Sequence, residues 1–415
     1  MTDLVVKDAA SVVPFAGTGP IRGVALSEIE VLERTSVTVD DGVVAAIGEP
    51  NDARVSFDAS GCTVVPGFVD PHTHLPFFGW RADEDAARLS GLRYESLHRE
   101  EGGIYRSVQM LADATDDEVV GFCADLAHGM LTTGTTTFET KSGYGLSVDA
   151  ELRQLRLARR LAAIVPQNVT TSCLSAHAVP KGKTEGEWVG EIAEEILPVV
   201  ARERLADAVD IYVESIAFQL EHAARLKMAA DALGLGMRMH ADQLEDSQAG
   251  SFAARWDLVS ADHLNHTSLE AVEDIAGGHT AAVLLPATAF TLRQNKRPPA
   301  RALVEAGATV ALGSDFNPGT SPISSMPFVI SLACRLLGLR PLEALAAATV
   351  NAACVLKLDG EAGRIQVGDP AELVVLDVPS FEHVPYRPDH DAVAAVICGG
   401  RFGHVAERAR GRISS

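Results

Sequence analysis

The sequence has no long hydrophobic run, since no stretch reaches the ~18 uninterrupted apolar residues that a membrane-spanning helix needs. Its first ten residues, MTDLVVKDAA, lack the basic region and apolar core of a signal peptide, so we expect no secretory leader. These two absences argue against a membrane or secreted protein, and we expect a cytoplasmic one.

Cysteine is also scarce, with six residues in 415 and no C-x-x-C pair. A disulfide framework is therefore not expected, because cysteines scattered through so long a chain are typical of reduced thiols in the cytoplasm. We expect all of them to behave as small buried apolar side chains. They are Cys62, Cys123, Cys173, Cys334, Cys354 and Cys398.

Positive charge is in deficit, with 35 Lys and Arg against 56 Asp and Glu and a formal net charge of −21. This balance argues against nucleic-acid and anionic-membrane partners, both of which favour a basic face. It leaves room for a small anionic substrate, because one well-placed arginine can bind a carboxylate. The hydrophobic fraction of 47% is enough for a large core.

The middle of the chain alternates short apolar or β-branched runs with helical patterns such as Ala150–Ala163. Eight strand–helix repeats predict a parallel (β/α)8 barrel of the TIM type. The alternative is an open doubly wound sheet, but no G-x-G-x-x-G follows the first run, which argues against its dinucleotide-binding version. The expected strands are Val64–Asp70, Thr135–Thr140, Val169–Ala176, Val209–Glu214, Gly236–His240, Leu258–Asp262, Ala281–Pro286 and Thr309–Ser314.

Both ends of the chain are rich in β-forming residues. Two such runs flank Asp40-Asp41-Gly42, which predicts a hairpin. Near the other end, Ala371–Asp377 and Ala394–Arg401 also read as strands. We expect the two ends to pair into one small β-sandwich domain, residues 1–63 with 360–415, and residues 64–359 to form the barrel between its halves.

The first expected barrel strand ends in His72-Thr73-His74. Residues i and i+2 of an extended chain point to the same side, so both imidazoles can face one point. An isolated H-x-H can also be a pair of surface histidines in a loop. Here His240 and Asp315 follow other strands, and three imidazoles with one carboxylate suit zinc or iron. A site of this kind that also binds water is catalytic.

Further polar residues stand at or near the ends of the expected strands. The carboxyl ends of all barrel strands converge on one face, so we expect these side chains to face the same site. Among them, His263 could act as a general acid or base, and the alternative is a core histidine hydrogen-bonded to Asp262. The set comprises Glu139, Lys141, Tyr144, His177, Glu214 and His263.

Several motifs together resemble the amidohydrolase superfamily and, within it, the imidazolonepropionase family of histidine degradation. H-x-H is common to the superfamily, whereas K-S-G-Y-G-L at 141–146 and S-D-F-N-P-G-T at 314–320 are much more specific. The similarity spans most of the barrel. The matching stretches are Asp70–His74, Gly79–Arg81, Glu139–Leu146, Ala176–Pro180, His240–Gln243, Ser260–Leu264, Lys296–Pro299, Ser314–Gly319 and Pro385–Arg387.

The resemblance implies hydrolysis of the ring C–N bond of 4-imidazolone-5-propanoate to N-formimidoyl-L-glutamate, and a homodimer. It implies one zinc or iron ion held by His72, His74, His240 and Asp315. The catalytic residues it implies are His263, Asp315, His177 and Gln243. The substrate contacts it implies are Arg81, Tyr94, Tyr144, His177, Gln243, Asn317, Gly319 and Thr320.

The residue types agree with this chemistry. Arg81 can form a bidentate, charge-assisted pair with the propionate of the substrate. Tyr144 lies between two glycines, where the backbone can approach a ligand closely. His177 can stabilise the oxyanion that develops when water attacks the lactam carbonyl. Asp315 or His263 would take the proton of that water.

Three alternatives involve single positions. Val213 stands where many relatives have cysteine, so we expect altered packing or a shifted substrate preference. A related deaminase acting on an aminated ring would need glutamate at position 243, and this chain has Gln243, which cannot shuttle a proton. A binuclear site bridged by a carboxylated Lys141 is disfavoured. In relatives with such a site the bridging lysine usually lies on strand 4, and the expected strand 4 of this chain has no lysine. A non-catalytic scaffold would have lost metal ligands, and all four are present.

Overall fold

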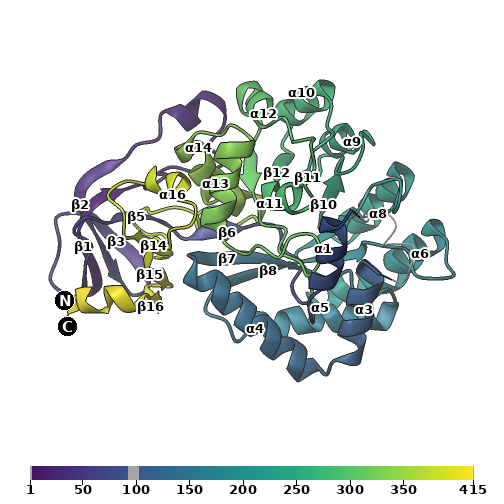
Figure 1. Ribbon diagram of the computed structural model, residues 1–415, viewed down its shortest axis with the longest axis horizontal. Helices are drawn as coiled ribbons and strands as arrows, with labels where there is room; N and C mark the ends of the chain where they lie inside the picture. The colour runs from purple at the N-terminus through teal and green to yellow at the C-terminus, as the bar shows by residue number, and fades with distance from the viewer. Residues whose placement is uncertain (1, 92–101, 415) are drawn as a thin grey trace.

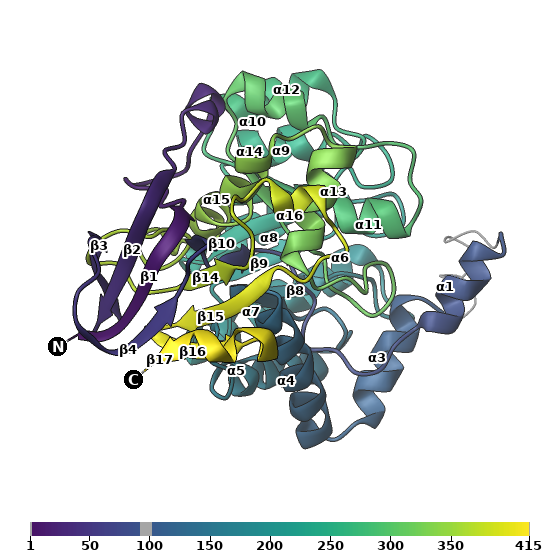
Figure 2. The same ribbon diagram turned by 60° about the vertical axis from the view of Figure 1, so that its left-hand side comes forward.

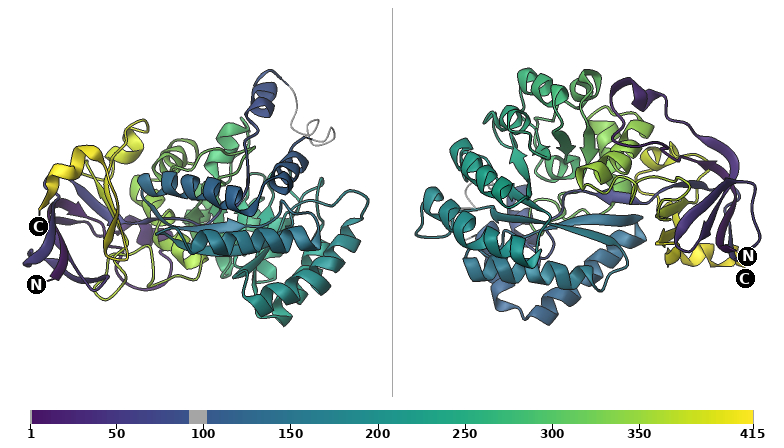
Figure 3. Two further views of the ribbon diagram at one scale, coloured as in Figure 1. Left: turned by 90° about the horizontal axis from the view of Figure 1, so that it is seen from below. Right: turned by 180° about the vertical axis from the view of Figure 1, so that it is seen from behind.

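The computed structural model describes residues 2–91 and 102–414, so the predicted contact Tyr94 lies outside the described residues. Two sheets organise the described chain, one of nine strands and one of eight. The nine-stranded sheet lies at one end of the molecule and the eight-stranded sheet, with its helices, forms the rest (Figures 1 and 3).

The eight-stranded sheet is parallel throughout and curls into a nearly closed barrel, which confirms the predicted fold class. Its edge strands β6 and β13 meet just beyond their ends, where Asp315 N–H donates to His72 C=O and His74 N–H to Phe316 C=O, both at 2.9 Å. The strands are β6 (Phe68–Asp70), β7 (Thr135–Lys141), β8 (Asn168–Ala176), β9 (Ala208–Ile211), β10 (Gly236–Ala241), β11 (Ser260–His263), β12 (Ala281–Leu284) and β13 (Val310–Leu312).

Helices connect these strands, and local signals explain where they begin. The Ser147 hydroxyl caps the helix expected at 150–163, which spans Val148–Ala162. Pro286, expected to end a strand, begins a helix instead, because its missing N–H costs nothing at a helix start. The α-helices are α1 (Ala82–Leu89), α3 (Ile104–Asp113), α4 (Asp116–Thr132), α5 (Val148–Ala162), α6 (Glu185–Glu191), α7 (Leu197–Glu203), α8 (Leu220–Ala232), α9 (Ala249–Arg255), α10 (Leu269–Gly277), α11 (Pro286–Thr291), α12 (Ala300–Ala306), α13 (Met326–Leu336), α14 (Pro341–Ala347), α15 (Val350–Val355) and α16 (His383–Tyr386). The 3-10 segments η1 (Gly23–Ser27) and η3 (Glu407–Arg412) and the π-helical turn η2 (Ile192–Ile196) complete the helical elements.

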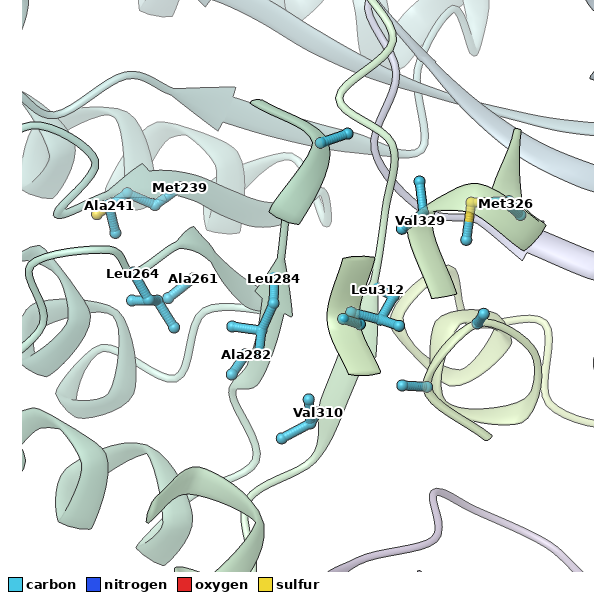
Figure 4. Packing of buried hydrophobic residues seen from close by; sticks show 14 of the residues in the cluster. Met239, Ala241, Ala261, Leu264, Ala282, Leu284, Val310, Leu312, Met326 and Val329 are labelled. Atoms are coloured by element: carbon cyan, nitrogen blue, oxygen red, sulfur yellow. The ribbon is translucent and has the colours of Figure 1, made fainter. Parts of the chain in front are cut away.

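The main apolar core lies between the barrel strands and the helices around them. Residues at alternate positions of the strands face outward, and many of them are apolar, as Met239 and Leu312 illustrate (Figure 4). The residues between them face the barrel interior. That interior is apolar beside β6, β12 and β13, and it is charged beside β7 and β10, where Lys141 and Arg238 are buried.

The nine-stranded sheet combines both ends of the chain, as predicted. Central strand β5 pairs antiparallel with β14, and the termini lie close together beside this sheet (Figures 1 and 2). The predicted hairpin is confirmed, with Asp41 and Gly42 at φ 49° and 79°, as a type I′ turn requires. The strands are β1 (Thr2–Val12), β2 (Leu32–Asp40), β3 (Val43–Gly48), β4 (Ala53–Asp58), β5 (Thr63–Pro66), β14 (Leu373–Leu376), β15 (Val393–Cys398), β16 (Arg401–Val405) and β17 (Ile413–Ser414).

The expected strand Val64–Asp70 is in fact two strands in different sheets. Thr63–Pro66 belongs to the sheet of the chain ends, and Phe68–Asp70 begins the barrel. They divide at Gly67, where a Cβ would lie 2.0 Å from the Thr136 hydroxyl oxygen, so only glycine fits this close passage. The division of the chain at residues 63 and 360 stays a prediction. The first three residues assigned to the barrel, 64–66, pair with β14 in the nine-stranded sheet.

The cysteines form no disulfide within the described chain, and four of the six are buried. The two others, Cys334 and Cys354, are partly buried. Among the described residues, every helix is too short or too polar to cross a bilayer.

A buried carboxyl group beside β14 predicts a pH-dependent stability. The Glu372 carboxylate accepts a hydrogen bond from Gly399 N–H at 2.7 Å, and burial raises its pKa from 4.5 to about 7. The folded state therefore holds this proton more tightly than the unfolded state, and stability is lost as the pH rises through 7. Glu372→Gln should stabilise the protein by about 1–3 kcal/mol at about pH 8 and by much less at about pH 4.5, as measured by urea unfolding. An equal gain at both pH values would contradict this assignment.

Candidate metal and substrate site

A cavity opens at the carboxyl ends of the barrel strands, where the predicted site was expected. Most of the predicted metal, catalytic and substrate-contact residues line it, from six different strand ends and the loop after β6. The lining residues are His74, Arg81, Ile104, Tyr144, His177, Tyr212, His240, Gln243, His263, Asp315, Asn317 and Thr320.

Three of the four predicted metal ligands form a buried group whose ring nitrogens lie within 4.8 Å of one another. The Nε2 atom of His240 lies 3.1 Å from that of His72 and 3.5 Å from that of His74. Donor atoms around a tetrahedral zinc ion are separated by about 3.4 Å. The three imidazoles are therefore spaced to hold one such ion.

The fourth predicted ligand, Asp315, stands beside this group. Its Oδ1 lies 3.0 Å from His74 Nε2 and 3.7 Å from His72 Nε2, and its Oδ2 accepts from the Thr288 hydroxyl at 2.5 Å. Its backbone is left-handed, with φ 54°, a conformation that non-glycine residues adopt mainly where the surroundings enforce it. Thr288, at the start of α11, is a supporting residue that the sequence did not single out.

The protonation of the imidazoles suits metal binding. Burial, reinforced by nearby positive groups, holds the pKa of His72 and of His74 well below the usual value, so both are neutral near pH 7. A metal ligand must be a neutral imidazole. His72 Nδ1 lies 2.6 Å from Asp262 and His240 Nδ1 lies 3.2 Å from Asp210. Protons on these Nδ1 atoms leave the Nε2 lone pairs directed at the shared centre.

His263 lies beside this centre, with its ring 5.3 Å from that of His240. It is buried, and neither ring nitrogen has a hydrogen-bond partner among the described residues. Burial lowers its pKa to about 3, so the ring is neutral near pH 7. The alternative of a core histidine bonded to Asp262 is wrong, because that carboxylate is occupied by His72, Arg238 and Ser260.

Arg81 immediately precedes α1 and places a buried guanidinium at the cavity wall. Its Nη1 lies 3.6 Å from Glu84, and its Nε is buried without a hydrogen-bond partner among the described residues. The guanidinium passes over Gly319, where an added Cβ would lie 1.5 Å from Arg81 Nη2. Gly319 therefore makes room for the arginine and does not itself line the cavity.

Tyr144 is held by hydrogen bonds from its loop to α5. The Glu151 carboxylate accepts from the N–H groups of Gly143, Gly145 and Leu146, and Gln154 accepts from Tyr144 N–H. A Cβ at Gly145 would lie 2.4 Å from the Glu151 backbone nitrogen. The lack of a side chain at Gly145 therefore makes room for α5, and the expectation that these glycines let the backbone approach a ligand stays a prediction.

His177 and Asn317 support the site in different ways. The His177 ring stacks on His74 with centroids 5.1 Å apart. The Asn317 amide braces its own loop, because its Oδ1 accepts from the N–H groups of Gly319 and Thr320 and its Nδ2 donates to Asp315 C=O. Asn317 thus fixes the position of the predicted ligand Asp315.

Three residues expected at this face lie elsewhere. Glu139 and Lys141 point into the barrel interior and pair with each other at 2.8 Å. Glu214 turns to the loop after β10, where it accepts from Leu244 N–H at 2.7 Å. Two lining residues were missed, namely Ile104 and Tyr212. Tyr212 lies within the expected strand Val209–Glu214, and its aromatic ring next to the strand end was the available signal.

Comparisons with known proteins agree with this geometry. Residues 63–403 match the amidohydrolase family. The imidazolonepropionase of Symbiobacterium thermophilum is 41% identical over 96% of this chain and 97% of its own length. That of Rubrobacter xylanophilus is 42% identical over 96% and 98%.

Solved structures share the fold at lower identity. An adenosine deaminase from Xanthomonas campestris with bound zinc covers 99% of this chain and 98% of its own, with a TM-score of 0.69 and 20% identity. Atrazine chlorohydrolase from Arthrobacter aurescens, complexed with zinc, covers 98% of each chain with a TM-score of 0.74 and 15% identity. On its matched length and its identity to the curated relatives, the chain belongs to the amidohydrolase family and, within it, to the imidazolonepropionases, hydrolases of cyclic-amide C–N bonds in histidine degradation.

Proposed function

We propose that this enzyme hydrolyses the ring C–N bond of 4-imidazolone-5-propanoate to give N-formimidoyl-L-glutamate. One observation carries the choice of substrate: a buried guanidinium, Arg81, lines the same cavity as the three-histidine group. A buried arginine suits a carboxylate, which it can bind through two parallel hydrogen bonds. The propionate of this substrate supplies that carboxylate, and its ring supplies the hydrolysed amide.

The residues His72, His74, His240 and Asp315 fit one divalent ion, which we propose is zinc or iron. A bound ion would supply Lewis acidity, lowering the pKa of water and polarising the ring carbonyl. His177 would donate a hydrogen bond to the carbonyl oxygen as charge develops there. His263 or Asp315 would accept the proton of the attacking water and return it to the leaving ring nitrogen.

The remaining cavity residues would orient the substrate. Arg81 would bind the propionate, while Tyr144, Gln243 and Thr320 would contact the ring or side chain. Gln243 carries an amide and cannot transfer a proton, so its contribution is a hydrogen bond. We further propose a cytoplasmic homodimer that acts on this anionic substrate without a nucleic-acid or membrane partner.

The direct test follows the ultraviolet absorbance of freshly prepared 4-imidazolone-5-propanoate mixed with zinc- or iron-loaded enzyme. We expect rapid, enzyme-dependent decay and N-formimidoyl-L-glutamate as the product by mass spectrometry. The spontaneous decay of the compound without enzyme is the control. If the fully metal-loaded enzyme gave decay no faster than this control, the proposed substrate would be refuted, whereas the assignment of the metal site would stand.

A His263→Gln variant tests the proton-transfer role. It should keep its metal, because His263 is not a proposed ligand, and lose about 100-fold or more in kcat with little change in KM. Metal content is measured by atomic absorption and rates by the same absorbance assay. Loss of the metal from this variant would instead make His263 a ligand.

A further inference from the structure

Five charged side chains are buried inside the barrel next to the proposed metal ligands. They alternate along their strands, so all point inward, and they come from four of the eight barrel strands. None of them lines the cavity. They are Glu139 and Lys141 of β7, Asp210 of β9, Arg238 of β10 and Asp262 of β11.

One side of this group orients His72. The Oδ2 of Asp262 lies 2.6 Å from His72 Nδ1 and accepts from Arg238 Nη2 at 2.8 Å. The Ser260 hydroxyl donates to the other oxygen at 2.6 Å and accepts from Arg238 Nε at 3.0 Å. The carboxylate that receives the His72 proton is thus fixed by the guanidinium.

The other side orients His240 in the same manner. The Oδ1 of Asp210 lies 3.2 Å from His240 Nδ1 and accepts from Ile211 N–H, while its Oδ2 accepts from Lys141 Nζ at 2.8 Å. Glu139 joins the two sides, because its Oε1 lies 2.8 Å from Lys141 Nζ and 2.7 Å from Arg238 Nη1.

Burying five charges is costly, and an apolar interior is often as stable or more so. The group is therefore better explained by what it orients. Its three carboxylates outnumber its two cations by one, which leaves negative charge facing two imidazoles. By contrast, His74 Nδ1 has no hydrogen-bond partner among the described residues, so it lacks such support.

We infer that Lys141 and Arg238 are positioning residues of the metal centre, which fix Asp210 and Asp262 and so hold the Nε2 atoms of His240 and His72 toward the ion. This inference rests on the proposed assignment of those histidines as ligands. It also excludes a bridging role for Lys141, whose ammonium is already bound between two carboxylates. Supporting contacts of this kind typically change metal affinity by about 10–100-fold.

Zinc affinity of the full-length protein, measured by competition with a chromogenic chelator, tests the inference without substrate. Lys141→Met and Asp210→Asn should each weaken zinc binding about 10-fold or more. The zinc affinity of the double variant, which carries both substitutions, should be within about twofold of that of Asp210→Asn, because Lys141 acts on His240 through Asp210. Additive losses, or wild-type affinity in the single variants, would overturn the inference.

A matched pair of arginines controls for general destabilisation and for a Lys141→Met variant that fails to fold. Arg238→Met should weaken zinc binding about 10-fold or more, whereas Arg364→Met should bind zinc as the wild type does. Arg364 is also buried, but it pairs with Asp359 and backbone carbonyls away from the site. Equal losses in both would overturn the inference. A wild-type protein that binds no zinc would instead overturn the ligand set and the proposed function.

Discussion

A His240→Ala variant is expected to be purified without bound metal and to lose at least about a thousandfold in kcat/KM, which corresponds to about 4 kcal/mol of transition-state stabilisation. His240 is central to the ligand group, since its Nε2 is within 3.5 Å of the Nε2 atoms of both other histidines. Its removal leaves two imidazoles and exposes the Asp210 carboxylate to the emptied space. The measurements are metal content by atomic absorption and rate by ultraviolet absorbance.

Two further samples make this result specific. His279→Ala removes an imidazole that is almost fully exposed and precedes the amino end of β12, whereas the ligands stand at the carboxyl ends of the strands, so both metal and activity should be retained. Chelator-treated wild type should match His240→Ala in activity and recover when zinc is restored, whereas the variant should not. Full activity of metal-free His240→Ala would show that the three-histidine group is not the reaction centre.

An Arg81→Met variant should show an increase in KM of about 100-fold or more with a much smaller change in kcat. Loss of one partner from a buried charge pair commonly costs about 2–5 kcal/mol. Methionine retains the aliphatic bulk at the cavity wall and removes the charge. The measurement is the KM for 4-imidazolone-5-propanoate, and an unchanged value would refute the carboxylate contact.

Gly319→Ala provides a matched change that keeps the arginine. The added Cβ would lie 1.5 Å from Arg81 Nη2, so the guanidinium must move aside. KM should therefore rise in the same direction as in Arg81→Met, while the net charge of the cavity is preserved. The KM of a substrate analogue without the carboxylate should change little in either variant, because the Arg81 guanidinium would then have no carboxylate to bind.

The barrel and the metal ligands could be predicted from the sequence because their signals are local. In an extended chain, residues two apart such as His72 and His74 point to the same side, and the eight repeats imply the face on which strand ends converge. The structure keeps His240 and Asp315 at that face, where the pattern placed them.

Other features depend on contacts between distant segments and could not be predicted this way. The division between β5 and β6 lies at Gly67, where the Thr136 side chain packs too closely to leave room for a Cβ. The inward pairing of Glu139 and Lys141 depends on which strands are neighbours across the barrel interior. Val213 proved to be a member of the main apolar core and not a cavity residue, which supports the packing interpretation over a change of substrate.

The pairing of β5 with β14 also constrains the order in which this enzyme can fold during its synthesis. Thr63, which opens β5, emerges about 310 residues before the Leu376 that pairs with it. At about 5–20 residues per second, the nascent chain waits for about 15–60 s with that edge of β5 uncovered. The same segment runs directly into β6 and His72. The strand that leads into β6 and His72 therefore gains its second neighbour in the nine-stranded sheet only after all eight barrel strands have been synthesised.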